Sequence, residues 1–409
     1  MKVLQINTVY GEGSTGKIAK DIHDICVEQG IGCVTAYRCR WKNRQTWPDT
    51  VEISTMLDSR IHGVLARSTM LKGCFSYGRT AHFLKWVEAY GPDVIHLHNL
   101  HGSYVNIPML MRYVKQKNIP VVWTLHDCWP FTGLCAYFSA VRCDRWQSGC
   151  GSCPLKKELS SGLVDRTHFV WEQKKKWFTG IRHGVIVTPS NWLAGLVKQS
   201  FLGDYRVQTI HNGIDLNVFH PTPSDFKKQN GIEKKKMVLG VAFDWGYRKG
   251  LDVVVQLAKE LPAEYAVVLV GTDEKVDAEL PENVVSIHRT NNQRELAEIY
   301  TAADVLINPT REDNFPTVNL EALACGTPVI TFKTGGSPEM LDKSSGIVVD
   351  QEDVEGMKAA ILHSCSQAAF SPLDCVRRGK EYDKNRKLGE YVGLYQNLLK
   401  EKMRSDGTK

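Results

Sequence analysis

The chain has 409 residues, of which 43% are hydrophobic and 23% are charged, and this composition predicts a globular protein of two or three domains. No apolar stretch approaches the roughly 20 residues that a membrane-spanning helix needs. The start of the chain (MKVLQINTVYG) resembles a buried strand and a turn rather than a signal peptide. Without export, twelve cysteines predict thiols or metal ligands rather than a disulfide framework.

The formal net charge of +6 is unevenly distributed along the chain. Residues 1–203 carry 25 Lys and Arg against 14 Asp and Glu, whereas the remaining residues carry 26 against 31. A basic first half favours an anionic partner, such as an anionic lipid or a lipid-diphosphate, although an incidental surface bias is the simpler alternative. We see no zinc-finger or RNP motif, so we expect no nucleic-acid partner.

The first predicted strand, residues 3–8, runs into a glycine-rich loop that reads G-x-x-x-x-G-K from Gly11 to Lys17, and a helix follows. This is most of a phosphate-binding P-loop, but Ile18 stands where a Ser or Thr would hold Mg²⁺. A P-loop NTPase and a glycine-rich turn without a ligand are therefore both alternatives for this loop.

Polar side chains follow two later predicted strands. Residues 93–97 run into His98, and residues 120–125 run into His126 and Asp127. Open α/β sheets bind their ligands at the carboxyl ends of strands. One histidine at such a place is more often structural, but a cluster favours a binding site.

Five cysteines follow the second of these strands. The last four have the spacing C-x7-C-x6-C-x2-C, and thiolates at such spacings can reach one tetrahedral zinc. We predict a structural zinc that braces the neighbouring site without taking part in chemistry; free thiols and an iron–sulfur cluster are the alternatives. The predicted ligands are Cys135, Cys143, Cys150 and Cys153.

Residues 169–178 (FVWEQKKKWF) combine aromatic and basic side chains on a predicted helix. Lys174, Lys175 and Lys176 would suit an anionic membrane surface. We favour the simpler interpretation, a solvated helix whose aromatic side chains lie in the core.

An Asn-Gly-Ile-Asp turn at 212–215 separates two series of predicted strands and helices. A strand at 237–242 then leads into the loop 244–250, which carries Arg248 and Lys249 just before the next helix. The repeated alternation of strand and helix predicts a second α/β domain.

The stretch 303–341 is the most informative part of the sequence. A short apolar strand is followed by a polar loop and by a helix that starts near Pro316 and ends at Gly326. The free N–H groups at the start of this helix favour negative charge. Asp313 precedes the helix and can accept hydrogen bonds from sugar hydroxyls, and Glu321 can accept two from a ribose diol. Either acid alone suggests a cap or a solvated side chain, but the whole run favours an anion and sugar site.

The run from Asp313 to Val329 reads DNFPTVNLEALACGTPV and resembles the E-x7-E signature of glycosyltransferase family four, the retaining enzymes with the GT-B fold. Asp313 stands where that family usually has Glu, and Asp244 stands where it usually has the Arg that precedes Lys249. Four further runs are similar to motifs of the family: DVIHLH at 93–98, TLHD at 124–127, VTPSNW at 187–192 and NGID at 212–215.

The resemblance implies an α/β protein with the GT-B fold, in which two Rossmann-like domains face a central cleft. It implies an acceptor-side domain at 1–205, with a cysteine-rich insertion near 128–153, and a nucleotide-sugar domain at 206–380. The remaining segment, 381–409, is expected to form a helix that crosses back to the first domain.

The resemblance also implies the roles of individual residues. It gives catalytic roles to His126, Asp127 and Asp313, with His126 in contact with the donor sugar. Lys249 and Arg248 would neutralise the donor's diphosphate, so no catalytic metal is expected. The donor-binding residues that it implies are Gly13, Arg248, Lys249, Asn314, Phe315, Pro316, Thr317 and Glu321.

The implied activity is transfer of a hexose, with retention, from a nucleotide-diphospho-sugar to a saccharide or lipid-linked saccharide in polysaccharide, capsule or O-antigen biosynthesis. We expect a cytoplasmic protein whose basic half makes peripheral contact with the inner face of the membrane. A phosphorylase or epimerase of the same fold is one alternative. The others are a P-loop NTPase and a catalytically silent GT-B protein that binds nucleotide-sugar, an alternative that the acids at 313 and 244 keep open.

Overall fold

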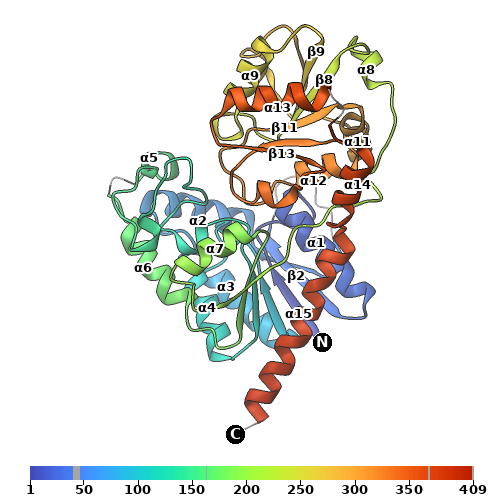
Figure 1. Ribbon diagram of the computed structural model, residues 1–409. Helices are drawn as coiled ribbons and strands as arrows, with labels where there is room; N and C mark the ends of the chain where they lie inside the picture. The colour runs from blue at the N-terminus through green and yellow to red at the C-terminus, as the bar shows by residue number, and fades with distance from the viewer. Residues whose placement is uncertain (40–46, 163, 367–368, 408–409) are drawn as a thin grey trace. The chain divides into compact units, whose positions relative to one another are not determined.

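The computed structural model describes residues 1–39, 47–162, 164–366 and 369–407 (Figure 1). The chain forms two compact units: Met1–Ile210 together with Leu388–Lys409, and His211–Lys387. Within the described residues, no helix is both long and apolar enough to cross a membrane.

The first unit contains a parallel seven-stranded sheet in the order β3-β2-β1-β4-β5-β6-β7. The order reverses between β1 and β4, which is the switch point where doubly wound sheets bind ligands. The strands are β1 (Lys2–Ile6), β2 (Gly32–Arg38), β3 (Thr50–Ser54), β4 (Val94–Leu97), β5 (Val121–Thr124), β6 (Gly184–Thr188) and β7 (Arg206–Thr209).

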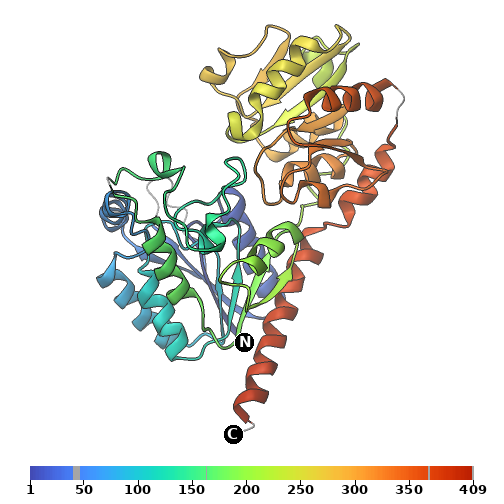
Figure 2. The same ribbon diagram turned by 60° about the vertical axis from the view of Figure 1, so that its left-hand side comes forward.

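Helices cover both faces of this sheet because its central strands are apolar on both sides. In Figure 2, α3 (Tyr77–Tyr90) and α4 (Ile107–Gln116) lie on one side of the sheet, and α15 (Lys384–Gly407) lies on the other. The remaining helices of this unit are α1 (Gly13–Glu28), α2 (Met56–Thr69), α5 (Lys156–Leu159), α6 (Thr167–Phe178) and α7 (Asn191–Gln199).

The second unit contains a parallel six-stranded sheet in the order β10-β9-β8-β11-β12-β13. Its strands are β8 (Lys236–Val241), β9 (Tyr265–Val270), β10 (Val284–Ile287), β11 (Val305–Asn308), β12 (Val329–Phe332) and β13 (Gly346–Val349). Its helices are α8 (Phe226–Gln229), α9 (Leu251–Glu260), α10 (Glu274–Asp277), α11 (Gln293–Ala302), α12 (Thr317–Ala324), α13 (Val354–Ser366) and α14 (Pro372–Lys380).

The predicted α/β class with two Rossmann-like units is confirmed by these two sheets. The predicted division at residue 206 precedes β7, which pairs with β6 in the first sheet, and the units divide after Ile210. Helix α15 begins at Lys384 in the second unit and continues into the first.

Helix α6 differs in one respect from our expectation of a solvated lysine run. The aromatic side chains of Trp171 and Phe178 are buried, as predicted, but Phe169 is about half exposed and Lys174 is fully buried. Its ammonium donates to the carbonyl oxygens of Trp129 and Thr132 at 2.7 and 2.9 Å and lies 3.4 Å from the Trp129 ring centroid. Lys174 therefore braces the loop after β5 from within, because its long side chain reaches two carbonyl oxygens of that loop.

Candidate functional site

Histidines gather at the carboxyl ends of β4 and β5 in the first unit. Because these strands are parallel neighbours, His98 and His126 meet, with His98 Nδ1 lying 3.0 Å from His126 Nε2. The other ring nitrogen of His98 lies 3.0 Å from Oε1 of Gln5, which comes from β1. Burial lowers the pKa of His98 well below its ordinary value and lowers the pKa of His126 to about 4. This part of the site is therefore neutral at physiological pH.

A second buried network supports the first from the sheet interior. His96 Nδ1 lies 2.6 Å from the Tyr395 hydroxyl, and its Nε2 lies 2.8 Å from the Thr124 hydroxyl. The Thr124 hydroxyl also bonds the hydroxyl of Tyr391 at 3.0 Å. The two tyrosines come from α15, so the last helix of the chain fixes the histidine ring that stacks on His98 with a centroid distance of 4.0 Å.

Asp127 provides the charged group of this cluster. Its carboxylate accepts a hydrogen bond from His101 Nε2 at 3.0 Å and one from the backbone N–H of Trp129 at 2.9 Å. Burial by itself would raise the pKa of Asp127, but these hydrogen bonds and the nearby histidines lower it. The carboxylate is thus held ionised and oriented by partners within its own unit.

Gly13 begins α1 in the left-handed conformation, with φ +63° and open space where a Cβ would lie. The loop before it closes onto the first turn of α1, because the N–H of Gly11 donates to the carbonyl of Gly16 at 2.9 Å. In a P-loop such N–H groups are directed at a phosphate. This closure and the missing hydroxyl at Ile18 disfavour the P-loop alternative.

In the second unit, the loop between β11 and α12 meets the 3₁₀ turn Tyr247–Lys249. Lys249 Nζ forms an ion pair with Oδ2 of Asp313 at 2.6 Å, and both side chains are about four-fifths buried. Arg248 Nη1 donates to the carbonyl of Glu312 at 3.3 Å. Two of the predicted donor-binding cations thus lie against the predicted acidic loop.

Arg311 was not predicted, and it anchors this loop. Its guanidinium is only 4% exposed, donates to both carboxylate oxygens of Asp252 and of Glu352 at 2.6–2.8 Å, and stacks on the Tyr247 ring. The hydrogen bonds that its guanidinium donates to Glu352 and Asp252 raise its pKa further. A loop arginine before a helix suggests a phosphate ligand, but the structure commits this one to two carboxylates.

Glycine is required where the next loop crosses the acidic one. Gly335 has φ +54°, and a Cβ on it would lie 1.7 Å from the carbonyl oxygen of Asp313. Only glycine allows this approach, so the loop after β12 supports the backbone at Asp313.

The first turns of α12 hold the remaining predicted donor-binding residues. Pro316 caps the helix, Thr317 begins it, and Asn314 and Phe315 are buried just before it. The Phe315 ring stacks on His211 with centroids 4.9 Å apart. The buried side chains of Asn314 and Phe315 therefore anchor the loop between β11 and α12.

Glu321 lies on α12, eight residues after Asp313. Its carboxylate accepts a hydrogen bond from the buried hydroxyl of Tyr300 at 2.8 Å. Burial and the Glu321 charge raise the pKa of Tyr300 well above its ordinary value. Tyr300 is a second residue that sequence reasoning missed, because nothing in its helix distinguishes it from a core tyrosine.

The four cysteines predicted to bind zinc line one small cavity of about 20 Å³ in the first unit. Gly133 donates its N–H to Cys150 Sγ, and Cys150 itself has φ +52°. In the part of the chain that the structure describes, no group of three or more His, Cys, Asp or Glu is arranged to hold a metal. The zinc therefore stays a prediction.

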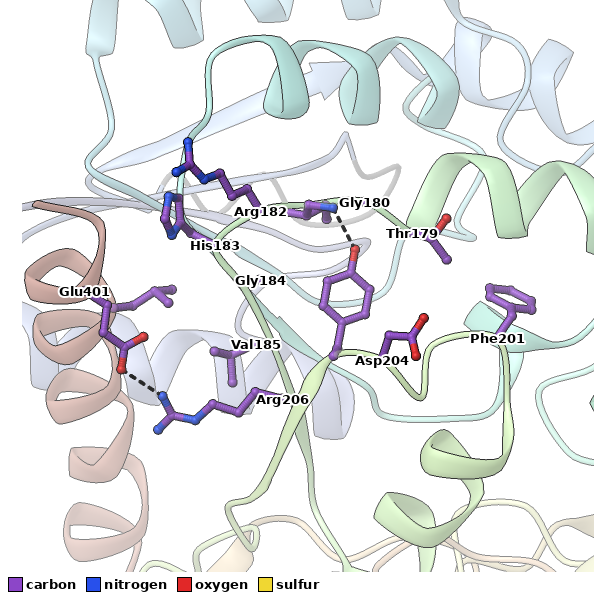
Figure 3. Close-up of a pocket in the computed structure, with 13 residues that line it drawn as sticks. Thr179, Gly180, Arg182, His183, Gly184, Val185, Phe201, Asp204, Arg206 and Glu401 are labelled. Carbon is purple, nitrogen blue, oxygen red and sulfur yellow. Dashed lines mark hydrogen bonds and ion pairs between the residues drawn. The ribbon is translucent and has the colours of Figure 1, made fainter. Parts of the chain in front are cut away.

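A larger pocket of about 500 Å³ lies elsewhere in the first unit, at the amino ends of β6 and β7 (Figure 3). Arg206 crosses its wall to pair with Glu401 at 3.1 Å, and the Tyr205 hydroxyl accepts from the N–H of Ile181 at 3.0 Å. Because the strands are parallel, this pocket lies at the opposite edge of the sheet from His98 and His126.

Two family models match this chain, and both describe glycosyltransferases. The family model "Glycosyl transferases group 1" matches residues 223–379, and the model "Glycosyltransferase Family 4" matches residues 52–218. A putative colanic acid biosynthesis glycosyl transferase, WcaC of Escherichia coli K12, is 28% identical over 414 residues, covering 97% of this chain and 100% of that protein.

Solved structures share the fold at lower identity. Sucrose-phosphate synthase from Thermosynechococcus elongatus superposes with a TM-score of 0.72 at 17% identity, covering 97% of this chain and 98% of that one. Anabaena HepE in complex with UDP-glucose gives a TM-score of 0.66 at 14% identity, covering 96% and 99%. The two sheets described above therefore form the GT-B fold.

The zinc prediction has a direct test in metal analysis. We expect protein purified from zinc-supplemented cells to contain about one zinc per chain, because four thiolates satisfy one tetrahedral ion. A Cys150→Ser/Cys153→Ser variant should lose the metal, whereas Cys325→Ser/Cys375→Ser, which alters two buried cysteines of the other unit, should keep it. Wild-type protein without zinc would contradict the prediction.

Proposed function

Since this chain belongs to glycosyltransferase family 4, we propose that it is a retaining transferase that moves a hexose from a nucleotide-diphospho-sugar to a saccharide or lipid-linked saccharide acceptor. The observation that carries the proposal is the Lys249–Asp313 ion pair at the start of the helix that bears Glu321. The name of the full-length relative supports a role in the synthesis of a cell-surface polysaccharide.

Lys249 and Asp313 give the donor site an exchangeable charge pair. Without donor, Asp313 neutralises Lys249 at 2.6 Å. The diphosphate of a bound donor would take over the ammonium, and the carboxylate would be released to accept bonds from sugar hydroxyls. As the glycosidic bond breaks, Lys249 and Arg248 would stabilise the charge on the leaving diphosphate, so we expect no catalytic metal.

The other half of the donor is assigned to α12. Glu321, held by Tyr300, is oriented to accept two hydrogen bonds from the ribose diol. The N–H groups of the first turn, from Thr317 onward, would meet a diphosphate oxygen. In the first unit, His126 and Asp127 would contact hydroxyls of the transferred sugar or of the acceptor. No enzymic nucleophile is invoked, and the acceptor attacks on the face that the diphosphate leaves.

The donor is tested with thermal melts of the protein in a panel of UDP-, GDP- and ADP-sugars. One nucleotide-sugar should raise the melting temperature, and Glu321→Ala should abolish the shift because the ribose loses its acceptor. Glu282→Ala, an exposed acid of the same unit, should leave the shift intact. Stabilisation by ATP-Mg²⁺ alone would overturn the proposal.

Retention can be tested without a known acceptor. Transferases slowly pass their sugar to water, and ¹H NMR of the freshly released hexose reports its anomeric configuration before mutarotation. The configuration of the donor should be kept. Binding of the donor with no release, even with acceptor extracts present, would instead identify a silent binding protein.

The proposed exchange of Asp313 for the diphosphate at Lys249 predicts how removal of Asp313 changes nucleotide binding. Asp313→Ala should bind UDP, the nucleotide in the HepE structure, about two- to five-fold more tightly, because Lys249 is no longer neutralised. The same variant should lose most of its transfer or hydrolysis rate. Calorimetric titration of UDP measures the first effect, with Asp350→Ala as an exposed-acid control. Unchanged or weaker UDP binding would show that the pair does not open for the diphosphate.

The acceptor side is proposed to meet an anionic lipid surface through α2. One face of this helix exposes Leu57, Ile61, Val64 and Leu65 by 67, 53, 69 and 39%, whereas His62 and Ala66 on the other face are buried. Arg60 and Arg67 are exposed beside this apolar stripe. Apolar side chains flanked by arginines suit insertion at the headgroup level of an anionic bilayer, and this supports the proposal of peripheral contact with the inner face of the cytoplasmic membrane.

Vesicle flotation tests this surface. Wild-type protein should float with phosphatidylglycerol-containing vesicles and less with pure phosphatidylcholine. Leu57→Ser/Val64→Ser should bind about ten-fold more weakly because two inserted side chains are lost. Val27→Ser/Leu373→Ser, which removes two exposed apolar side chains elsewhere, should bind normally. Equal flotation of both variants, or a wild-type dimer that the α2 variant disrupts, would overturn the membrane assignment.

A further inference from the structure

Gln5, His98 and His126 form a hydrogen-bonded series linked by contacts of 3.0 Å, in which Gln5 and His98 are buried and His126 is half-buried. We infer that Gln5 and His98 are positioning residues that fix the tautomer of His126, an inference that rests on the proposed function of His126 as a contact for the sugar. The three residues lie on β1 or just after β4 and β5, next to the switch point of the first sheet.

The orientation of the Gln5 amide is set by its surroundings. Gln5 Nε2 lies 2.9 Å from the carbonyl oxygen of Ala19, which can only accept, and 3.3 Å from the Thr35 hydroxyl. The amide nitrogen must therefore face Ala19, and the amide oxygen must face His98. Gln5 is fully buried in the core, so the reversed orientation would leave two oxygens facing each other without water.

The orientation of Gln5 determines the tautomer of His98. An amide oxygen accepts, so the nitrogen 3.0 Å from it, His98 Nε2, carries the proton. His98 is about 1% exposed, and its burial keeps the ring neutral. The second nitrogen, Nδ1, therefore presents a lone pair.

The tautomer of His98 in turn determines the tautomer of His126. Its Nε2 lies 3.0 Å from the lone pair of His98 Nδ1 and must donate, so Nε2 carries the proton of His126. The ring is neutral, and its Nδ1 can only accept. Any group that meets Nδ1, including a sugar hydroxyl, must then act as donor, which restricts how a substrate can be bound.

Histidine-selective ¹⁵N NMR of the full-length protein tests the inference directly, because protonated and unprotonated ring nitrogens have well-separated shifts. The His126 signals are assigned by their loss in His126→Asn. Wild-type protein should show His126 protonated at Nε2. In Gln5→Leu, which removes the acceptor for His98, the His126 signals should shift toward the other tautomer. An unchanged His126 tautomer in folded Gln5→Leu protein would overturn the inference, whatever the activity.

Kinetics of donor hydrolysis separate positioning from a structural role. His98→Leu should lower kcat roughly 10- to 100-fold with little change in donor KM, because the binding groups of the second unit are untouched. His98→Asn keeps an acceptor oxygen near the position of Nδ1 and should recover most of kcat. His62→Asn alters a buried histidine that takes no part in the Gln5–His98–His126 hydrogen bonds, and this variant should retain wild-type kcat. Melting curves confirm that each variant is folded.

The outcomes also distinguish this inference from the proposed function. If no donor is processed by the wild-type enzyme, the proposed function fails, while the NMR result still decides whether Gln5 sets the tautomer. If transfer occurs and His98→Leu and His98→Asn are equally slow, the acceptor at Nδ1 is irrelevant and the positioning role is overturned.

Discussion

Parallel strand pairing is the constraint on which the polar cluster of each unit depends. In a parallel sheet all carboxyl ends meet at one edge, so residues far apart in sequence become neighbours only because their strands end together. His98 and Gln5 are 93 residues apart, and Lys249 and Asp313 are 64 apart, yet each pair is in direct contact. Breaking the register of one strand would therefore remove a partner from the chemistry as well as from the core.

The two units hold different kinds of polar groups: neutral histidines beside one ionised carboxylate, Asp127, in the first, and cations paired with carboxylates in the second. In the first unit, burial lowers the pKa values of His96, His98 and His126, and these side chains form neutral hydrogen bonds. In the second unit, Lys249 and Arg311 are held beside carboxylates at salt-bridge distance. The proposed diphosphate site lies in the second unit because that unit holds Lys249 and Arg248 beside its acidic loop.

Much of the fold followed from the sequence, because apolar strands and glycine-rich loops are local signals. The E-x7-E-like run predicted the position of Asp313 before a helix and of Glu321 on it. The partners could not be predicted, since a single sequence does not show which distant side chain reaches a given one. Arg311 was given no role from the sequence, although it is committed to Asp252 and Glu352, and Lys174 was expected on a solvated helix but is buried over Trp129.

One physical constraint distinguishes the roles of Arg311 and Lys249. A cation in a structure is available to a ligand only if its partner can be released without leaving a charge buried. Arg311 has two bidentate carboxylate partners and an aromatic ring beneath it, so removing it would leave both acids unpaired. Lys249 has one ion-pair partner, and that partner is itself a candidate ligand for the sugar. In the proposed donor complex, the diphosphate would replace Asp313 as the partner of Lys249, and the sugar hydroxyls would replace Lys249 as partners of Asp313. Lys249, rather than the better-anchored Arg311, is therefore the cation suited to a substrate that must bind and leave.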